Sequence, residues 1–361
     1  MSGYQIAFTG LKRQYNNLRT EILDATDSVL TSGILMDGTR TSHFELWLAG
    51  KNKTKYAVTC HSGTQALEII AEYYKQRINI VPPKILVPAF TFPASANAFI
   101  RAGWDIEFID TDAYGIMDLD QIDLSQTHHA VLAVGLYGAS VEHFGRTYHT
   151  YVGSVIEDAA QHWLSNGCTR ISHIAAISFD PMKNLGNYGN GGAVVTNDME
   201  FVNFANGWRC HGKNTNHAEV GTNSRMSEVD CAQLLVKSKY IDEWQQRRFD
   251  IAHHWMVRFK DAPLRCLVTP TNIDRHALHK FVIDIDNRDA VQEKLKQAGI
   301  ETKVHYQHPL HELPAYQQYK GPSILSAASS LSRRCLSLPI YPELTDSEVE
   351  HITTTVLTCL S

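Results

Sequence analysis

A series of short apolar runs between residues 56 and 197 constrains the fold more than any other feature of the sequence. These runs are nearly continuous, which is typical of strands covered by helices on both faces. Helical patterns separate them, and in one of these Ala66, Ile69 and Ile70 share a face. The alternation predicts an α/β fold with a mostly parallel sheet flanked by helices. The strands are expected at 56–60, 84–90, 105–111, 130–138, 154–160, 175–179 and 192–197.

The pattern changes near residue 240, where a long amphipathic helix is predicted at 241–262. Its expected buried stripe consists of Ile241, Trp244, Phe249, Ala252, Trp255 and Phe259. The segments expected to follow are a strand at 277–286, a helix at 288–299, a strand at 300–306 and a helix at 345–357. Thr345 and Glu348 have the spacing of a capping box. We therefore predict a large domain at 1–240, including an N-terminal arm, and a smaller C-terminal α+β domain at 241–361.

Composition and charge exclude several classes of protein. The 33 basic and 38 acidic residues give a net charge of −5 without a basic stripe, so no nucleic-acid partner is expected. Since no apolar stretch approaches about 18 residues, no membrane association is expected either. The seven cysteines are odd in number and form no C-x-x-C pair, which favours reduced thiols and a cytoplasmic location.

Three short motifs carry candidate chemistry. Gly63 lies in the turn Ser62-Gly63-Thr64 before a predicted helix, where backbone amides can bind an anion; a plain helix cap is the alternative. Asp158 ends an apolar strand, where a carboxylate can pair with a cationic ring nitrogen or simply cap a turn. Lys183 follows a strand in a constrained loop, where desolvation would make its amine nucleophilic, although most lysines are merely solvated.

One cofactor accounts for all three motifs. Pyridoxal phosphate (PLP) needs an anion cradle for its phosphate, a carboxylate for its pyridinium nitrogen and a lysine for its aldehyde. The glycine-rich segment 186–192 matches neither a P-loop nor a dinucleotide fingerprint, because a strand follows it. Its glycines instead indicate a backbone that passes close to a bulky group.

The block at 178–192, SFDPMKNLGNYGNGG, resembles the SF-x-P-x-K-x-LG-x-x-G-x-GG pattern of the DegT/DnrJ/EryC1/StrS family of PLP-dependent sugar aminotransferases. SGTQAL, VPAFTFPASANA, IEDAAQ and GTNSRMSEV resemble other blocks of this family, in order along the chain. The resemblance implies the fold type I architecture of aspartate aminotransferase, with a seven-stranded sheet. In this chain Asp180 stands where many relatives carry His or Tyr, and Asn190 where many carry Asp.

The resemblance also implies roles for individual residues. Lys183 would form the aldimine with PLP and shuttle the proton, and Asp158 would pair with the ring nitrogen. Gln161 would approach the ring hydroxyl, and Phe92 would stack on the ring unless it is a core aromatic. The residues implied to hold the phosphate are Gly63, Thr64 and Ser178, with Asn223 reaching across from a neighbouring subunit. The active sites would therefore be shared within a homodimer.

Substrate contacts are the least constrained part of the site. Arg225 would bind near the phosphate, bind a substrate carboxylate or form a structural ion pair. His305 and His311 would lie in a loop at the mouth of the site. Together with His308 they invite a metal interpretation, but Pro309 disfavours a helix that presents all three, so no metal is expected.

The resulting hypothesis is a PLP-dependent aminotransferase that converts a keto-deoxysugar carried on dTDP or UDP into an amino sugar for glycan biosynthesis. L-glutamate would be the amino donor, in two half-reactions through Lys183. The alternatives are a PLP-dependent sugar dehydratase, which is a lyase, and a non-catalytic PLP-binding regulatory protein. Some dehydratases of this kind carry His in place of the lysine, so the retained Lys183 favours transamination.

Overall fold

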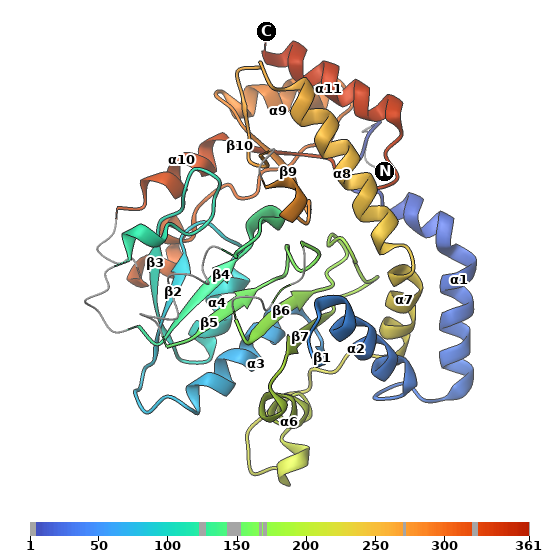
Figure 1. Cartoon of the computed structure of the whole chain (residues 1–361), viewed down its shortest axis with the longest axis vertical. Helices are drawn as coiled ribbons and strands as arrows, with labels where there is room; N and C mark the ends of the chain where they lie inside the picture. Colours follow the sequence, from blue (N-terminus) through green and yellow to red (C-terminus); the bar gives the residue numbers. More distant parts are fainter. Residues whose placement is uncertain are drawn as a thin grey trace.

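The computed structural model describes residues 5–122, 128–142, 153–165, 168, 172–269, 272–319 and 324–360. A seven-stranded sheet at its centre has the order β1-β7-β6-β5-β4-β2-β3 (Figure 1). Its strands are β1 (Tyr56–Cys60), β2 (Lys84–Pro88), β3 (Asp105–Ile109), β4 (Ala130–Val134), β5 (Val155–Asp158), β6 (Ile174–Ser178) and β7 (Gly192–Thr196). Only β7 pairs antiparallel, with β1 and β6, and the other pairs are parallel. The predicted α/β class and mostly parallel sheet are confirmed.

Both faces of the sheet are buried, which explains why the strands are apolar throughout. In β7, Val194 packs into one core cluster while its neighbours Ala193 and Val195 pack into another. The first face is covered by α3 (Gly63–Lys75), α4 (Ala94–Arg101) and α6 (Met199–Trp208). The second face is covered by α1 (Leu11–Ser32), α2 (Thr39–Asn52) and α7 (Glu228–Ser238).

The C-terminal third of the chain gathers at one end of the molecule (Figure 1). It contains an antiparallel sheet in the order β10-β9-β8 and a core of its own. Its elements are α8 (Ile241–Arg258), β8 (Arg265–Cys266), β9 (Phe281–Asp284), α9 (Arg288–Gln297), α10 (Ser326–Arg334), β10 (Cys335–Leu338) and α11 (Asp346–Leu360). The capping box predicted at Thr345 is confirmed, since Glu348 N donates to Thr345 Oγ1 at 3.2 Å and Thr345 N donates to Glu348 Oε2 at 2.9 Å.

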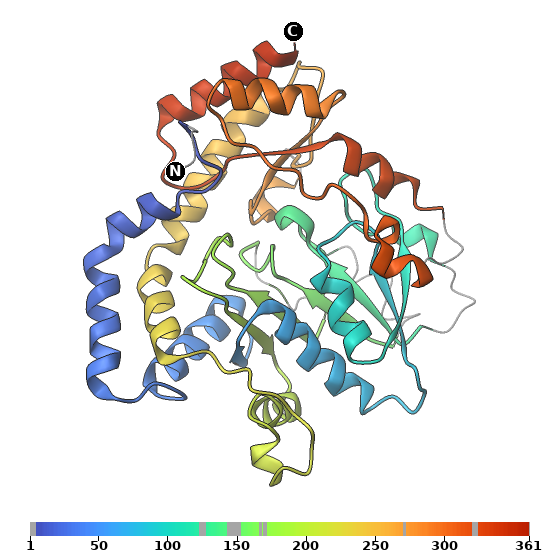
Figure 2. The ribbon, with the colours of Figure 1, turned by 180° about the vertical axis from the view of Figure 1, so that it is seen from behind.

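The N-terminal segment packs with this C-terminal core, as Figure 2 shows beside α11. Ile6 is buried there, and its N–H donates to the Gly299 carbonyl at 3.0 Å while its own carbonyl accepts from Glu301 N at 2.9 Å. The predicted domain boundary between residues 240 and 241 stays a prediction. The structure adds that the N-terminal arm, predicted as part of the large domain, contacts the core of the C-terminal third.

Two local predictions were wrong. The segment 300–306 forms no strand; Ile300 and Lys303 make isolated bridges to Ile6 and Ser337. In α8, Phe249 is half-buried against the second core rather than fully buried, and Ile251, which the predicted stripe omitted, is buried. Within the described residues, no helix is long and apolar enough to cross a membrane.

Candidate active site

The candidate site lies where the ends of β1 and β6 meet the start of β7. Gly192 pairs with both Cys60 and Ser178, so the turn after β1 and the loop after β6 begin side by side, at the same end of the strands. A Cβ atom at position 63 would lie 2.7 Å from the Cβ of Ser178, and one at position 192 would lie 2.3 Å from the carbonyl carbon of Ser62. Both contacts are too short for any side chain, so glycine is required for this close approach.

The turn after β1 forms an anion cradle. Ser62 Oγ accepts from Gln65 N at 3.2 Å, so Ser62 is the N-cap of α3. The plain helix cap that the sequence analysis gave as the alternative for this turn is therefore present. Gly63 and Thr64 are the first residues of α3, and no acceptor for their N–H groups lies in the described part of the chain. With the Ser178 hydroxyl beside Gly63, these donors and the helix dipole favour a bound anion.

Asp158, the last residue of β5, is 6% exposed and is held by two hydrogen bonds. Its Oδ2 accepts from Ser95 Oγ at 2.7 Å, and its Oδ1 accepts from Ala160 N at 3.2 Å. Ser95 Oγ lies in turn 3.0 Å from Thr91 Oγ1. The carboxylate is therefore fixed in orientation and shielded from solvent, as a partner for a cationic ring nitrogen must be.

Lys183 lies in a tight turn after β6. Its N–H donates to the Asp180 carbonyl at 2.8 Å, and Met182 N donates to Asp180 Oδ1 at 3.0 Å. Burial lowers the pKa of the Lys183 amine, and the charges of Asp158 and Asp180 oppose this shift in part. A larger fraction of neutral amine makes Lys183 a better nucleophile toward an aldehyde.

Gln161 and two aromatic residues complete the side of the site next to Asp158. Gln161 Oε1 accepts from Tyr137 N at 2.9 Å, and its Nε2 donates to the Tyr306 hydroxyl at 3.3 Å. The ring of Phe92 lies 5.8 Å from that of Tyr306 and is 52% exposed. The core-aromatic alternative for Phe92 is therefore wrong, and a ring is left free to stack on a ligand.

The three histidines do not come together. His305 Nδ1 lies 2.8 Å from Ser337 Oγ, and burial with nearby Lys280 and Lys183 lowers the pKa of His305 to about 3. His311 is buried, with Nε2 3.3 Å from Ser329 Oγ, while His308 is exposed. Among the residues that the structure describes, no group of His, Cys, Asp and Glu could hold a metal ion.

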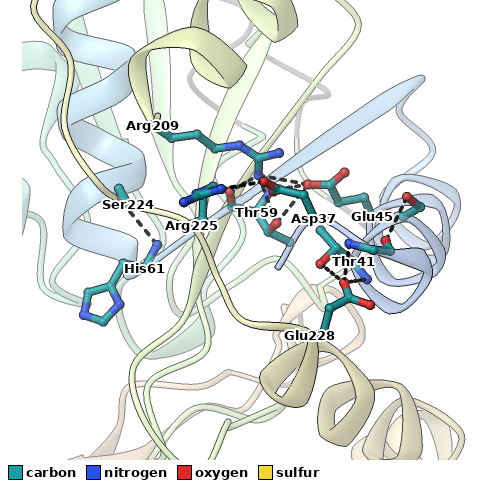
Figure 3. Close-up of polar contacts among 11 residues, drawn as sticks. Asp37, Thr41, Glu45, Thr59, His61, Arg209, Ser224, Arg225 and Glu228 are labelled. Carbon is teal, nitrogen blue, oxygen red and sulfur yellow. Dashed lines mark hydrogen bonds and ion pairs between the residues drawn. The ribbon is translucent and has the colours of Figure 1, made fainter. Parts of the chain in front are cut away.

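The segment from Asn223 to Arg225 runs beside the turn that follows β1, as the contact between Ser224 and His61 shows (Figure 3). In this segment, the Ser224 carbonyl accepts from His61 N at 3.0 Å, next to the turn that contains Gly63. The Asn223 side chain is exposed. Arg225 donates to Asp37 Oδ2 at 2.7 Å, which is the ion-pair arrangement considered among the alternatives for this residue.

Several residues of the site had no signal in the sequence. Ser95 contacts Asp158 from 63 positions away, and Tyr306 contacts Gln161 from 145 positions away. No sequence spacing rule connects such distant positions. Lys280, whose charge acts on both His305 and His279, is the third. The proximity of its strand to the site is a property of the tertiary fold.

The residues fit PLP. The cradle at Gly63 offers amides and a hydroxyl to a phosphate, the buried Asp158 suits a protonated pyridine nitrogen, and Lys183 has the lowered pKa that imine formation requires. Such a site, at the carboxyl ends of strands in a mostly parallel sheet, defines the class of fold type I PLP enzymes.

Comparison with known proteins identifies the family. The chain belongs to the DegT/DnrJ/EryC1/StrS aminotransferase family, whose profile matches residues 16–357. It is 32% identical to the pleiotropic regulatory protein of Geobacillus stearothermophilus, over 95% of each chain. It is also 32% identical to the dTDP-3-amino-3,4,6-trideoxy-alpha-D-glucose transaminase of Streptomyces venezuelae, over 94% of this chain and 92% of that one.

A solved structure supports both the fold and the cofactor. The crystal structure of S. venezuelae DesV in complex with a ketimine intermediate aligns with a TM-score of 0.89 at 30% identity, over 98% of each chain. The chain is thus a PLP-dependent aminotransferase of the sugar-modifying family.

Proposed function

We propose that this enzyme transfers the amino group of L-glutamate to a keto-deoxysugar linked to dTDP or UDP, in the cytoplasm. The observation that carries the proposal is the position of Lys183, in the loop after β6, near the buried carboxylate of Asp158 at the end of the neighbouring strand β5, since the charge of that carboxylate acts on the lysine amine. The nucleotide-sugar substrate is supported by the activity named for the S. venezuelae relative.

When bound, PLP supplies an electron sink that stabilises the negative charge left by removal of a proton from the amino donor. Asp158, oriented by Ser95, keeps the ring nitrogen protonated. The Lys183 amine would take the proton from the donor carbon and later give a proton back, so one side chain would act as base and then as acid. In the second half-reaction the keto sugar accepts the amino group, and Lys183 moves protons in the reverse order.

The proposal includes a homodimer. Asn223 is exposed on the single chain and lies beside the anion cradle, so its side chain is accessible to a second subunit. Size-exclusion chromatography with light scattering should give twice the mass of 40.6 kDa. In a mixture of inactive Lys183→Ala and inactive Asn223→Ala subunits, restored activity would show that the sites are shared.

The decisive experiment incubates the PLP-loaded enzyme with L-glutamate and follows the absorbance of the bound cofactor. Glutamate should bleach the absorbance of the aldehyde form and release 2-oxoglutarate in equal amount. A panel of dTDP- and UDP-linked keto sugars should then restore the absorbance, and mass spectrometry of the product identifies the sugar. Lys183→Ala should show neither change, and full turnover by that variant would refute the assignment.

A regulatory protein is the second candidate, because a relative of equal identity is named a pleiotropic regulatory protein. A non-catalytic protein would bind PLP without being bleached by glutamate. A sugar dehydratase, the remaining alternative, would release ammonia rather than form 2-oxoglutarate. The same absorbance and product assays separate all three functions.

A further inference from the structure

A pocket beside Lys183 is lined by more positive than negative side chains. It lies between the segment that leads into α1, the loop that contains Lys183, the middle of α8, the residues just before β9 and the residues after β10. Lys183, Lys280 and Arg248 line it, and Glu343 is the only carboxylate among its lining residues. Burial raises the pKa of Glu343, so this carboxyl group offsets the positive charge only in part.

Lys280 is the unusual member of this group. It is 6% exposed, yet within the described ranges its ammonium group has neither a hydrogen-bond acceptor nor an ion-pair partner. The Lys280 Nζ atom lies over the ring of Phe8, 5.0 Å from the ring centroid, in a cation–π arrangement. Burial without a partner disfavours the charged form of this amine, so a ligand that carries a negative charge would stabilise its ammonium form.

Arg248 adds to the positive charge of the pocket. Its Nη1 donates to the carbonyls of Leu278 at 3.2 Å and Ile340 at 2.7 Å, and its Nε has no partner in the described structure. Since carbonyl oxygens carry no net charge, the guanidinium charge is offset, among the described groups, only by the nearby Glu343. The pocket therefore favours an anion that reaches both Lys280 and the reacting centre at Lys183.

We propose that Lys280 binds a carboxylate group of a reactant, and that this pocket is the carboxylate subsite of the transamination reaction. The inference rests on the proposed function, since it assumes that reactants reach Lys183. Two sources share this chemistry: the side-chain carboxylate of the amino donor, and an acid group on the sugar acceptor. A carboxylate at this position would form a charge-assisted hydrogen bond with Nζ.

The surroundings of Lys280 couple this binding to a proton. Burial and the charges of Lys183 and Arg248 hold the pKa of Lys280 well below its usual range when the pocket is empty. A bound carboxylate raises that pKa, so binding takes up a proton and weakens as the pH rises. The titratable and charged groups that face Lys280 are Lys183, Arg248, Asp180, Lys303, His279 and His305.

Lys303 provides a matched control. Its Nζ lies 5.8 Å from the centroid of the same Phe8 ring, but the side chain is exposed and pairs with Glu301 at 3.3 Å. It does not line the pocket. Loss of Lys303 removes one positive charge from the neighbourhood without removing the buried ammonium.

The test measures binding of glutarate, a dicarboxylate that cannot react, to the PLP-loaded enzyme by titration calorimetry. Lys280→Met should weaken glutarate binding at least tenfold, and Lys303→Met less than threefold. Titrations in buffers of different ionisation enthalpy should show proton uptake by the wild type. Lys280→Arg should retain binding without proton uptake, because an arginine stays charged. Equal affinities in the wild type and Lys280→Met, or no binding by either, would overturn the proposal.

Separate half-reactions identify the source of the carboxylate. If it belongs to the donor, Lys280→Met raises the glutamate concentration needed for half-maximal bleaching by a larger factor than the concentration of a neutral keto sugar needed for half-maximal recovery. If it belongs to the acceptor, the variant loses only its preference for acidic over neutral keto sugars. A wild-type enzyme that binds glutarate but is not bleached by glutamate would refute the proposed function and leave the anion subsite standing.

Discussion

Ser95 Oγ lies 2.7 Å from Asp158 Oδ2, so a residue of α4 orients the carboxylate that ends β5. This contact joins helix α4 to strand β5 at the point where the ring nitrogen of a bound cofactor would lie. Ser95 Oγ also lies 3.0 Å from Thr91 Oγ1, within hydrogen-bond distance. The Asp158 carboxylate therefore belongs to a short buried chain of hydrogen-bonded polar groups.

The first prediction concerns this chain. Ser95→Ala removes one donor to Asp158 without removing its charge, and a hydrogen bond to a charged group contributes about 1.5 to 3 kcal/mol. We expect kcat to fall by roughly ten- to a hundredfold. In Asp158→Asn the kcat should fall further than in Ser95→Ala, because the ring nitrogen loses its anionic partner. Steady-state kinetics measures both, and wild-type kcat in Ser95→Ala would show that Ser95 is not needed for orientation.

Replacement of Gly63 should weaken PLP binding. In Gly63→Ala the new Cβ would lie 2.7 Å from Ser178 Cβ, so the cradle must widen. We expect PLP affinity to fall at least tenfold in an absorbance titration of the apoenzyme. Gly50→Ala in α2 is the control, because nothing lies within 4 Å of its Cβ and alanine favours a helix. Unchanged PLP affinity in Gly63→Ala would contradict the cradle.

The ion pair between Arg13 and Glu348 should make stability depend on acid pH. Arg13 Nη1 and Nη2 donate to the two carboxylate oxygens at 2.7 and 2.5 Å, and this lowers the pKa of Glu348 from 4.5 to about 2. A depressed carboxyl pKa stabilises the fold above about pH 4.5, and the stabilisation is lost as the pH falls toward 2.

Arg13→Met should therefore lower the free energy of unfolding by about 1 to 2 kcal/mol at pH 7, less than the full shift implies because the arginine is 41% exposed. Urea denaturation at pH 7 and at pH 3.5 measures the difference between wild type and variant. The difference should shrink at the lower pH. A difference that stays constant would mean that packing of the Arg13 stem, rather than the ion pair, provides the stability.

Glu228 should be needed for stability rather than for catalysis. Its carboxylate accepts from the backbone amides of Gly38, Arg40 and Thr41 at 2.8 to 2.9 Å, and it joins the start of α7 to the start of α2 (Figure 3). Glu228→Ala leaves these amides without their acceptor and should cost about 2 to 4 kcal/mol in thermal or urea unfolding. The exposed Glu243→Ala should change stability by less than about 0.5 kcal/mol. Equal stabilities would refute this role.

The sequence predicted the strands of the large sheet to within a few residues, because their burial on both faces leaves an unbroken apolar pattern. It failed at 300–306, where Ile300 and Val304 suggest alternation but the segment finds only isolated bridges. An apolar pattern reports burial, whereas a strand also needs a continuous partner, and the partner is set by tertiary structure.

The same distinction applies to the site. Lys183 and Asp158 could be proposed from the sequence because each lies at or just after the end of an apolar strand within a motif that has a chemical purpose. Ser95 and Tyr306 contact Asp158 and Gln161 from distant segments, and Lys280 lines a pocket with Lys183, so these positions become visible only in the folded chain. Their residue types carry no distinctive local pattern.

The pairing of Ile6 with residues 299–301 has a consequence for biosynthesis. Ile6 is synthesised well before residues 299–301, which lie almost 300 positions later in the chain. At about 5 to 20 residues per second, this isoleucine waits roughly 15 to 60 s for its binding surface. The second core can therefore be completed only after residues 299–301 have been made, because Ile6 is buried in it through these contacts.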